Sequence, residues 1–157
     1  MRTLVVYYSR TGNNRRIASE LAEALGADIE ELKEEADRSG KVGYMMAGRD
    51  AMRRRPARLL PLSHNPANYD LVVLGGPCWA FTMCTPTRTY GIEHRHSLRK
   101  VAFFATAGSG GSAQKSVGAM VEAMGIEPLA SLVLSDAEVS GEHSEAVARF
   151  VGEVGAA

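Results

Sequence analysis

The chain has 157 residues, 45% of them apolar, and a formal net charge of zero at neutral pH. This length predicts one domain, residues 1–157, and leaves too little chain for a second core of ordinary size. The neutral balance, without basic stretches interleaved with aromatic residues, argues against a nucleic-acid-binding protein.

Cysteine usage and hydropathy predict a cytoplasmic protein that does not enter a membrane. Cys78 and Cys84 are the only cysteines, too few for a disulfide framework and compatible with a reducing compartment. Residues 1–3 lead directly into a strand-like pattern, so we expect no signal peptide. The longest nearly apolar run, residues 71–81, is far shorter than a membrane-spanning helix.

Charge is unevenly distributed along the first half of the chain. Residues 20–38 hold eight acidic and two basic side chains, and residues 41–60 hold six basic and one acidic. We interpret the basic run as a solvated face.

The chain opens with a strand, a loop and a helix. Residues 4–8 form an apolar run typical of a buried strand, and residues 15–25 carry apolar side chains at helical spacing up to Gly26. The loop between them is Ser9, Arg10, Thr11, Gly12, Asn13 and Asn14. Its hydroxyls and amides, next to the unpaired N–H groups of a helix N-terminus, indicate a phosphate pocket. An ordinary helix cap without a ligand is the alternative.

The next segment is less regular. We expect a strand at 27–32 near a sheet edge, a polar loop at 33–40, and an irregular crossing at 59–66. Residues 42–54 predict a helix ended by Pro56, with Met45, Met46 and Met52 in the core. Residues 69–74 form a second buried apolar run.

The remaining chain continues the alternation. An irregular loop at 75–82 carries the only tryptophan, Trp79. We expect a helix at 85–90, a polar loop at 91–100, a strand at 101–105, a small-residue loop at 106–112, a helix at 113–124, a strand at 129–134 and a helix at 144–154. His94 and His96 lie beside Glu93 without an apparent third metal ligand, so we predict no metal site.

Five strands that alternate with helices predict an α/β fold, a parallel sheet with helices on both faces. In such sheets ligands bind beyond the carboxyl ends of the strands. The three unusual strand-end loops offer a phosphate pocket, an exposed indole at Trp79 suited to stacking, and a glycine-rich stretch that lets backbone groups approach a ring edge. Together they predict a mononucleotide with a large aromatic head.

Three segments carry a family resemblance: residues 7–14 (YYSRTGNN), 76–82 (GPCWAFT) and 104–108 (FATAG). They resemble the FMN-binding loops of the flavodoxin family, and the resemblance covers essentially the whole chain. It implies a flavodoxin-like three-layer sandwich with strand order 2-1-3-4-5 and FMN as cofactor. The implied phosphate ligands are Ser9, Arg10, Thr11, Gly12, Asn13 and Asn14. The implied isoalloxazine contacts are Pro77, Cys78, Trp79, Ala80, Phe81 and Thr82 on one side, and Thr106, Ala107, Gly108, Ser109, Gly110 and Gly111 on the other side and edge.

One residue and one loop depart from the family pattern. Asn14 stands where the family's phosphate loop usually ends in threonine, so we expect weaker phosphate binding. The third loop lacks the tyrosine and acidic residues of long-known flavodoxins. We interpret Cys78 and Cys84 as small packing residues rather than redox thiols.

The sequence leaves three functions open. The first is an electron carrier that exchanges electrons with a redox partner protein, and the second is an NAD(P)H-dependent oxidoreductase acting on quinones or similar acceptors. The third is a binding module with a degenerate flavin site. Five bases expected near the strand-end loops (Arg10, Arg88, Arg95, Arg99 and Lys100) predict a less negative flavin potential than in acidic flavodoxins, or a site for the phosphate of NADPH. A phosphate-binding ATPase is excluded because no Gly-Lys-Ser/Thr loop is present.

Overall fold

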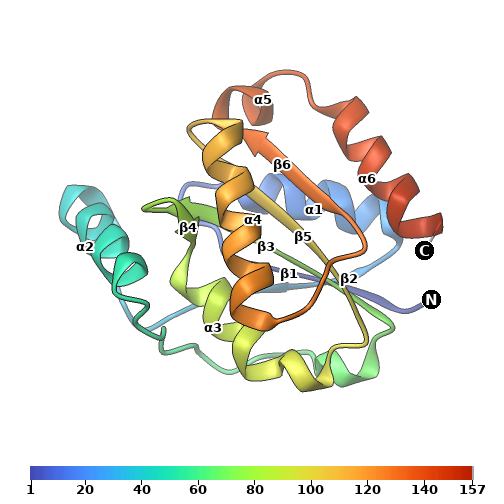
Figure 1. Cartoon of the computed structure of the whole chain (residues 1–157), viewed down its shortest axis with the longest axis horizontal. Coiled ribbons are helices and arrows are strands. Elements are labelled where there is room, and N and C mark those ends of the chain that lie inside the picture. The colour runs from blue at the N-terminus through green and yellow to red at the C-terminus, as the bar shows by residue number, and fades with distance from the viewer. Residues whose placement is uncertain (157) are drawn as a thin grey trace.

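The computed structural model of the protein describes residues 1–156, which form a three-layer α/β structure (Figure 1). The strands are β1 (Thr3–Tyr7), β2 (Asp28–Glu31), β3 (Leu71–Trp79), β4 (Thr82–Met83), β5 (Lys100–Ala107) and β6 (Ser131–Ser135). The helices are α1 (Asn13–Leu25), α2 (Gly40–Met52), α3 (Thr85–His94), α4 (Gly110–Met124), α5 (Asp136–Ser140) and α6 (Ser144–Ala156), with 3₁₀ turns η1 (Pro66–Asn68) and η2 (Arg95–Ser97). None of the helices in this part of the chain has the length and apolar character needed to cross a bilayer.

Five strands form one parallel sheet in the order β2-β1-β3-β5-β6. This arrangement confirms the predicted five-stranded parallel sheet and its order. The two-residue strand β4 is an addition that pairs antiparallel with the end of β3. Because the strands run in parallel, each crossover is made by helices packed on a face of the sheet.

The sheet separates two apolar cores. Successive side chains of a strand point to opposite faces, so Val5 packs with Ile17 of α1 and Phe150 of α6 on one side. On the other side Val6 belongs to the cluster that includes Met120 of α4. Helices α2 and α3 also lie on this second side, and α2 stands at the margin of the molecule (Figure 1).

Two predicted boundaries are wrong, and one helix was not predicted. Strand β3 continues to Trp79, where a loop was expected, because its last residues pair with β5 and β4. Helix α3 continues to His94 across part of the expected polar loop. Helix α5 was not anticipated, although Ser135 and Glu138 form a capping box at its start, a pattern readable from sequence.

The predicted core position of the α2 methionines is also wrong. Met45 and Met52 are 72% and 73% exposed, and Met46 is 40% exposed. The buried stripe of α2 consists of small residues and one acid, Gly43, Ala47, Asp50 and Ala51. A Cβ on Gly43 would lie 2.3 Å from the carbonyl carbon of Arg38, so α2 packs too closely against that segment for large side chains to point inward.

Gly75→Ala should destabilise the protein, because a Cβ there would lie 2.1 Å from the Phe104 ring in β5. Overpacking of this kind typically lowers the free energy of unfolding by about 1–3 kcal/mol, which urea denaturation measures. The matched control is Gly118→Ala on the exposed side of α4, where nothing lies within 4 Å of the added Cβ. Replacing that helical glycine should raise stability by about 0.5–1 kcal/mol. Equal unfolding free energies for the two variants would contradict this packing at Gly75.

Candidate cofactor site

The carboxyl ends of β1, β3 and β5 lie side by side at one edge of the sheet (Figure 1). Tyr7 pairs with Gly75, and Gly75 pairs in turn with Phe104. The segments that follow these strands therefore meet at the same edge, which is where open parallel sheets bind ligands. They are the turn from β1 to α1, the β3–β4 hairpin and the turn from β5 to α4.

The turn from β1 to α1 leaves the N-terminus of α1 without a side-chain cap. Gly12 is the N-cap residue and has a left-handed φ of 102°, which glycine adopts without steric cost. The Ser9 hydroxyl oxygen accepts from the Gly12 N–H at 3.0 Å, which closes the loop on itself. The first backbone N–H groups of α1 consequently point out of the helix toward this loop.

The first turn of α1 has no acidic residue. Instead it carries Arg15 and Arg16, whose positive charges are unfavourable at the positive end of the helix dipole. The Arg15 Nε donates to Glu31 of β2 at 3.1 Å, and the Arg16 Nε donates to Glu20, one turn further along α1, at 3.4 Å, so both cations are paired with acids. An anion above this turn would be favoured by both the dipole and the free N–H groups.

Asn13 and Asn14 tie α1 to other parts of the edge. The Asn13 amide donates to Asp136 of α5 at 3.1 Å. The buried Asn14 amide donates to the hydroxyl of Thr106 in β5 at 2.8 Å, which joins the first and third predicted loops. The Asn14 Oδ1 is buried without a hydrogen-bond partner, so this side chain is only half satisfied.

The β3–β4 hairpin turns through Ala80 and Phe81, which both have left-handed backbones, with φ of 51° and 65°. Two central residues at positive φ are typical of a type I′ hairpin, usually built from asparagine or glycine. Here an alanine and a phenylalanine bear a strain of about 1–2 kcal/mol each. Phe81 is 67% exposed at the tip, with the Lys115 ammonium 5.2 Å from its ring centre.

The prediction that the Trp79 indole is exposed is wrong, because Trp79 is only 5% exposed. Its ring meets Tyr8 edge-on with centroids 5.4 Å apart, and the Arg38 guanidinium carbon lies 5.4 Å from its centroid. Because the strand pairing of β3 continues to Trp79, its side chain points into the core below α2. Most of the indole therefore packs against protein, and the exposed aromatic ring of the hairpin is Phe81.

The two cysteines have different environments. Cys84 is fully buried, its thiol donates to Thr87 at 3.2 Å, and burial raises its pKa to about 12. It is therefore a packing residue, as predicted. Cys78 is partly exposed in the hairpin.

The third predicted loop is shorter than expected. Thr106 and Ala107 are the last residues of β5, and α4 begins at Gly110. Ser109 is the N-cap, and its hydroxyl accepts from the Ser112 N–H at 3.2 Å. Side chains built at Gly108 or Gly110 would meet no atom within 4 Å, so the backbone at this turn is open to a ligand.

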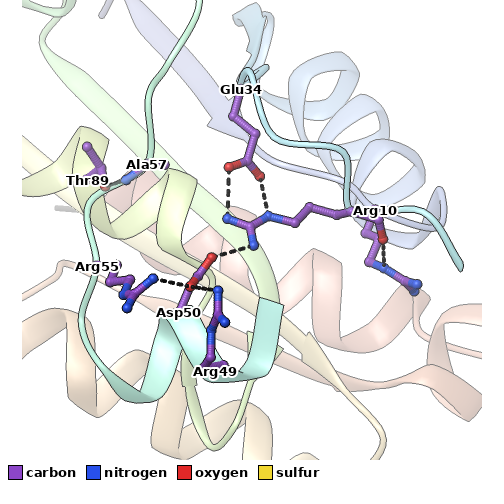
Figure 2. Close-up of polar contacts among 8 residues, drawn as sticks. Arg10, Glu34, Arg49, Asp50, Arg55, Ala57 and Thr89 are labelled. Carbon is purple, nitrogen blue, oxygen red and sulfur yellow. Dashed lines mark hydrogen bonds and ion pairs between the residues drawn. The ribbon is translucent and has the colours of Figure 1, made fainter. Parts of the chain in front are cut away.

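A buried ion cluster stands beside these loops (Figure 2). Arg38 donates to both carboxylate oxygens of Glu34 at 3.2 Å and to Asp50 of α2 at 2.7 Å. The side chains of Arg38 and Glu34 are only 6% and 3% exposed. Arg49 and Arg55 approach Asp50 from the solvent side at 3.4 and 3.7 Å. The cluster holds residues 34–38 and α2 against each other.

Arg10 connects the first loop to this cluster. Its guanidinium donates to the backbone carbonyl of Arg38 at 2.9 Å and to that of Gly40 at 3.1 Å, and it lies over the Tyr44 ring. A cleft of about 360 Å³ lies between the two segments, lined by residues 8–11 and 38–40. The site thus has a third wall, made of residues 38–40.

Most of the bases expected at the strand-end loops lie elsewhere. Lys100 is the first residue of β5, and Arg99 donates to Asp70 directly before β3, so both lie at the amino edge of the sheet with Arg95. Arg88 is half-buried in α3 near Arg54. Of the five, only Arg10 lies in a strand-end loop, which removes most of the basis for the predicted shift of the flavin potential.

Sequence reasoning missed this cluster: it placed Glu34 and Arg38 in a polar loop, and Asp50 in the basic run interpreted as a solvated face. Glu34 and Arg38 are four residues apart, the spacing of a helical ion pair, but they lie in a non-helical segment. Their burial depends on the approach of α2. No ordered group of three metal-binding side chains occurs within residues 1–156.

The fold is a parallel α/β sheet with an uncapped helix N-terminus at its carboxyl edge, the edge at which ligands bind in proteins of this class. The family model described as flavodoxin matches residues 2–124. The chain therefore belongs to the flavodoxin family.

Solved structures show the same fold. A flavoprotein from Lactobacillus acidophilus in complex with FMN has a TM-score of 0.70 and 22% identity, over 88% of this chain and 96% of that one. A flavodoxin, WrbA-like protein from Agrobacterium tumefaciens has a TM-score of 0.61 and 15% identity, over 96% and 95%. A Fusobacterium nucleatum flavodoxin bound to flavin mononucleotide has a TM-score of 0.58 and 9% identity, over 99% and 98%. No curated protein sequence matches the chain.

Arg38→Met should destabilise the protein strongly, because it removes the cation paired with the buried Glu34 carboxylate and the shortest ion pair of Asp50. Removing one partner of a buried ion pair costs about 3–5 kcal/mol, measurable by urea denaturation. The control is Arg58→Met, which removes an 87% exposed side chain 3.9 Å from Glu35 and should cost less than about 1 kcal/mol.

The same variant should alter the dependence of stability on pH. Burial raises the pKa of Asp50, but the hydrogen bond and charge of Arg38, with Arg49, outweigh burial and hold this pKa below its ordinary value. Such a group stabilises the fold at neutral pH and loses its contribution as the pH falls below about 4. The stability gap between parent and Arg38→Met should therefore narrow between pH 6 and pH 3. A constant gap would contradict the ion pair.

Proposed function

We propose that the protein binds FMN non-covalently at the carboxyl edge of its sheet and carries electrons on it. The observation that carries this proposal is the uncapped N-terminus of α1, with a left-handed glycine at the cap position and no acid in its first turn. Membership of the flavodoxin family supports the choice of ligand. The bound FMN would supply the redox chemistry, and the protein would bind and orient it.

The phosphate end of FMN would lie over residues 9–14. The backbone N–H groups at the start of α1 and the hydroxyls of Ser9 and Thr11 are the donors for its oxygens. Thr11 is exposed and free to turn toward an anion. Asn14 would act mainly by holding this loop to Thr106, rather than as a phosphate ligand through its own amide.

The isoalloxazine would lie between residues 77–82 and residues 106–111. The strained turn at Ala80 and Phe81 supports this placement, because left-handed backbones at non-glycine residues cluster at ligand sites. On the other side, the open backbone at Gly108 and Gly110 can approach a ring edge. With Trp79 buried, Phe81 is the exposed aromatic group available to the flavin.

A second candidate function is an NAD(P)H-dependent oxidoreductase. It is favoured by Arg49 and Arg53, which line a groove beside the hairpin together with apolar residues of α2. Cations in this position could receive an anionic reductant or acceptor next to the flavin. Anaerobic titration with NADPH and NADH separates the two functions: rapid loss of the flavin absorbance indicates an oxidoreductase, and reduction by dithionite alone indicates a carrier.

Thr11→Val should weaken FMN binding several-fold and leave riboflavin binding unchanged, because only FMN carries a phosphate for the hydroxyl to donate to. Quenching of flavin fluorescence on binding measures both affinities. The parent protein should bind FMN more tightly than riboflavin.

The control variant is Thr3→Val at the start of β1, far from the loop, which should leave the ratio of the two affinities unchanged. Equal affinity of the parent for FMN and riboflavin would contradict a phosphate site at α1. Failure to bind either flavin would leave the protein as a non-redox binding module.

A further inference from the structure

A groove of about 520 Å³ runs between α2 and the β3–β4 hairpin. One wall is a continuous stripe of α2, since its lining residues recur every four positions: Tyr44, Gly48 and Met52 in one row, and Met45, Arg49 and Arg53 in the next. Cys78, Trp79 and Ala80 form the other wall. The lining includes no residue of the loops at 9–14 and 106–111, so this groove is next to the proposed FMN site and separate from its phosphate end.

The apolar part of the groove is open to solvent. Tyr44, Met45 and Met52 are 64%, 72% and 73% exposed, which is unusual for large apolar side chains gathered on one face. Methionine sulfur and aromatic rings make favourable contacts with flat aromatic groups. The volume of the groove lies in the range of small-molecule sites.

The charged side chains that line the groove are all positive. Arg49 and Arg53 line it, and no carboxylate does. Arg53 is exposed at the end of α2, and the Arg49 side chain is 44% exposed, with Asp50 at 3.4 Å. A guanidinium both pairs with anions and stacks on flat rings. The groove therefore offers a wide apolar surface with two cations at one end.

The α2 wall is held in place. Asp50, on the buried side of the helix, is bonded to Arg38, and Gly43 brings α2 into close contact with the backbone of that residue. Because these contacts fix the helix against the rest of the protein, its backbone needs no ordering when a ligand enters, and binding avoids that part of the entropic cost.

We propose that this groove binds a flat aromatic molecule that carries an anionic group. Its apolar ring would lie between the α2 methionines and the hairpin, and its anion would lie against Arg49 and Arg53. Such a molecule would sit beside the flavin loops, as an electron donor or acceptor must. The proposal rests on the proposed function only for this redox role, since the groove and its charges exist without the flavin.

The test uses the FMN-loaded protein and two isosteric probes, 2-naphthalenesulfonate and the uncharged 2-naphthalenesulfonamide. Trp79 is the only tryptophan and lines the groove, so its indole N–H resonance reports binding there, and calorimetry gives the affinities. The sulfonate should shift this resonance and bind at least threefold more tightly than the sulfonamide. Added salt should reduce this preference.

Arg53→Gln should weaken sulfonate binding about threefold, the scale of a partly exposed ion pair, and leave sulfonamide binding unchanged. Met52→Gln should weaken both probes. The matched control is Arg58→Gln, which removes another exposed arginine, outside the groove, and should change neither affinity.

Several results would overturn the proposal. Equal affinity for the two probes, or an equal effect of Arg53→Gln and Arg58→Gln, would show that the arginines of the groove do not bind the anionic group. Release of FMN by the sulfonate would show that the flavin itself occupies the groove. A dimer that Met52→Glu dissociates would show that a second copy covers it. If the protein fails to bind FMN, the same titrations on the flavin-free protein still test the groove. Failure of the proposed function can therefore be distinguished from failure of the groove proposal.

Discussion

The pairing of β3 with β1 on one side and β5 on the other is the constraint on which the site depends. Gly75 lies between Tyr7 and Phe104 in adjacent strands, and the Phe104 ring occupies the space where a side chain of residue 75 would stand. With this register, the three strands end at one edge, and the turns that follow them meet there. The hydrogen bond from Asn14 to Thr106 joins the outer two turns directly.

A second level of organisation comes from Arg38. Its guanidinium bonds to Glu34 and Asp50, its backbone carbonyl accepts from Arg10, and it lies against the ring of Trp79. This one residue therefore contacts the α2 wall, the first loop and the hairpin. A buried ion pair contributes little net stability compared with apolar packing, but it fixes the relative position of these parts. That is the property that a preformed ligand site requires.

The sequence was sufficient to predict the fold because its information is local. Runs such as residues 4–8 and 101–105 are apolar throughout, as strands buried on both faces must be, and the family segments gave the strand order. The turn from β1 to the start of α1 was equally readable, since Ser9, Gly12 and the following helix lie together in the chain. Both depend on neighbours in sequence.

The predictions that were wrong concern features that depend on contacts between residues distant in the sequence. The burial of Trp79 follows from the continuation of β3 and from Arg38 in another segment. The exposure of Met45 follows from the close approach of α2, which selects small residues for its inner face. Arg99 precedes β5 and Lys100 begins it, so the direction of the strand places both bases at the edge of the sheet opposite the site. A short helix such as α5 has too little periodicity to be detected except through its cap.

We propose that the N-terminus of α1 holds the phosphate of FMN. The most direct measurement is a comparison of amide ¹H–¹⁵N spectra of the protein with and without FMN. If the proposal is correct, the amide protons of Asn13, Asn14 and Arg15 move downfield by the largest amounts, as N–H groups do when they donate to an anion. Riboflavin should leave these three resonances nearly unchanged. FMN binding that shifts resonances only in the hairpin and α2, with those of residues 13–15 unmoved, would contradict it.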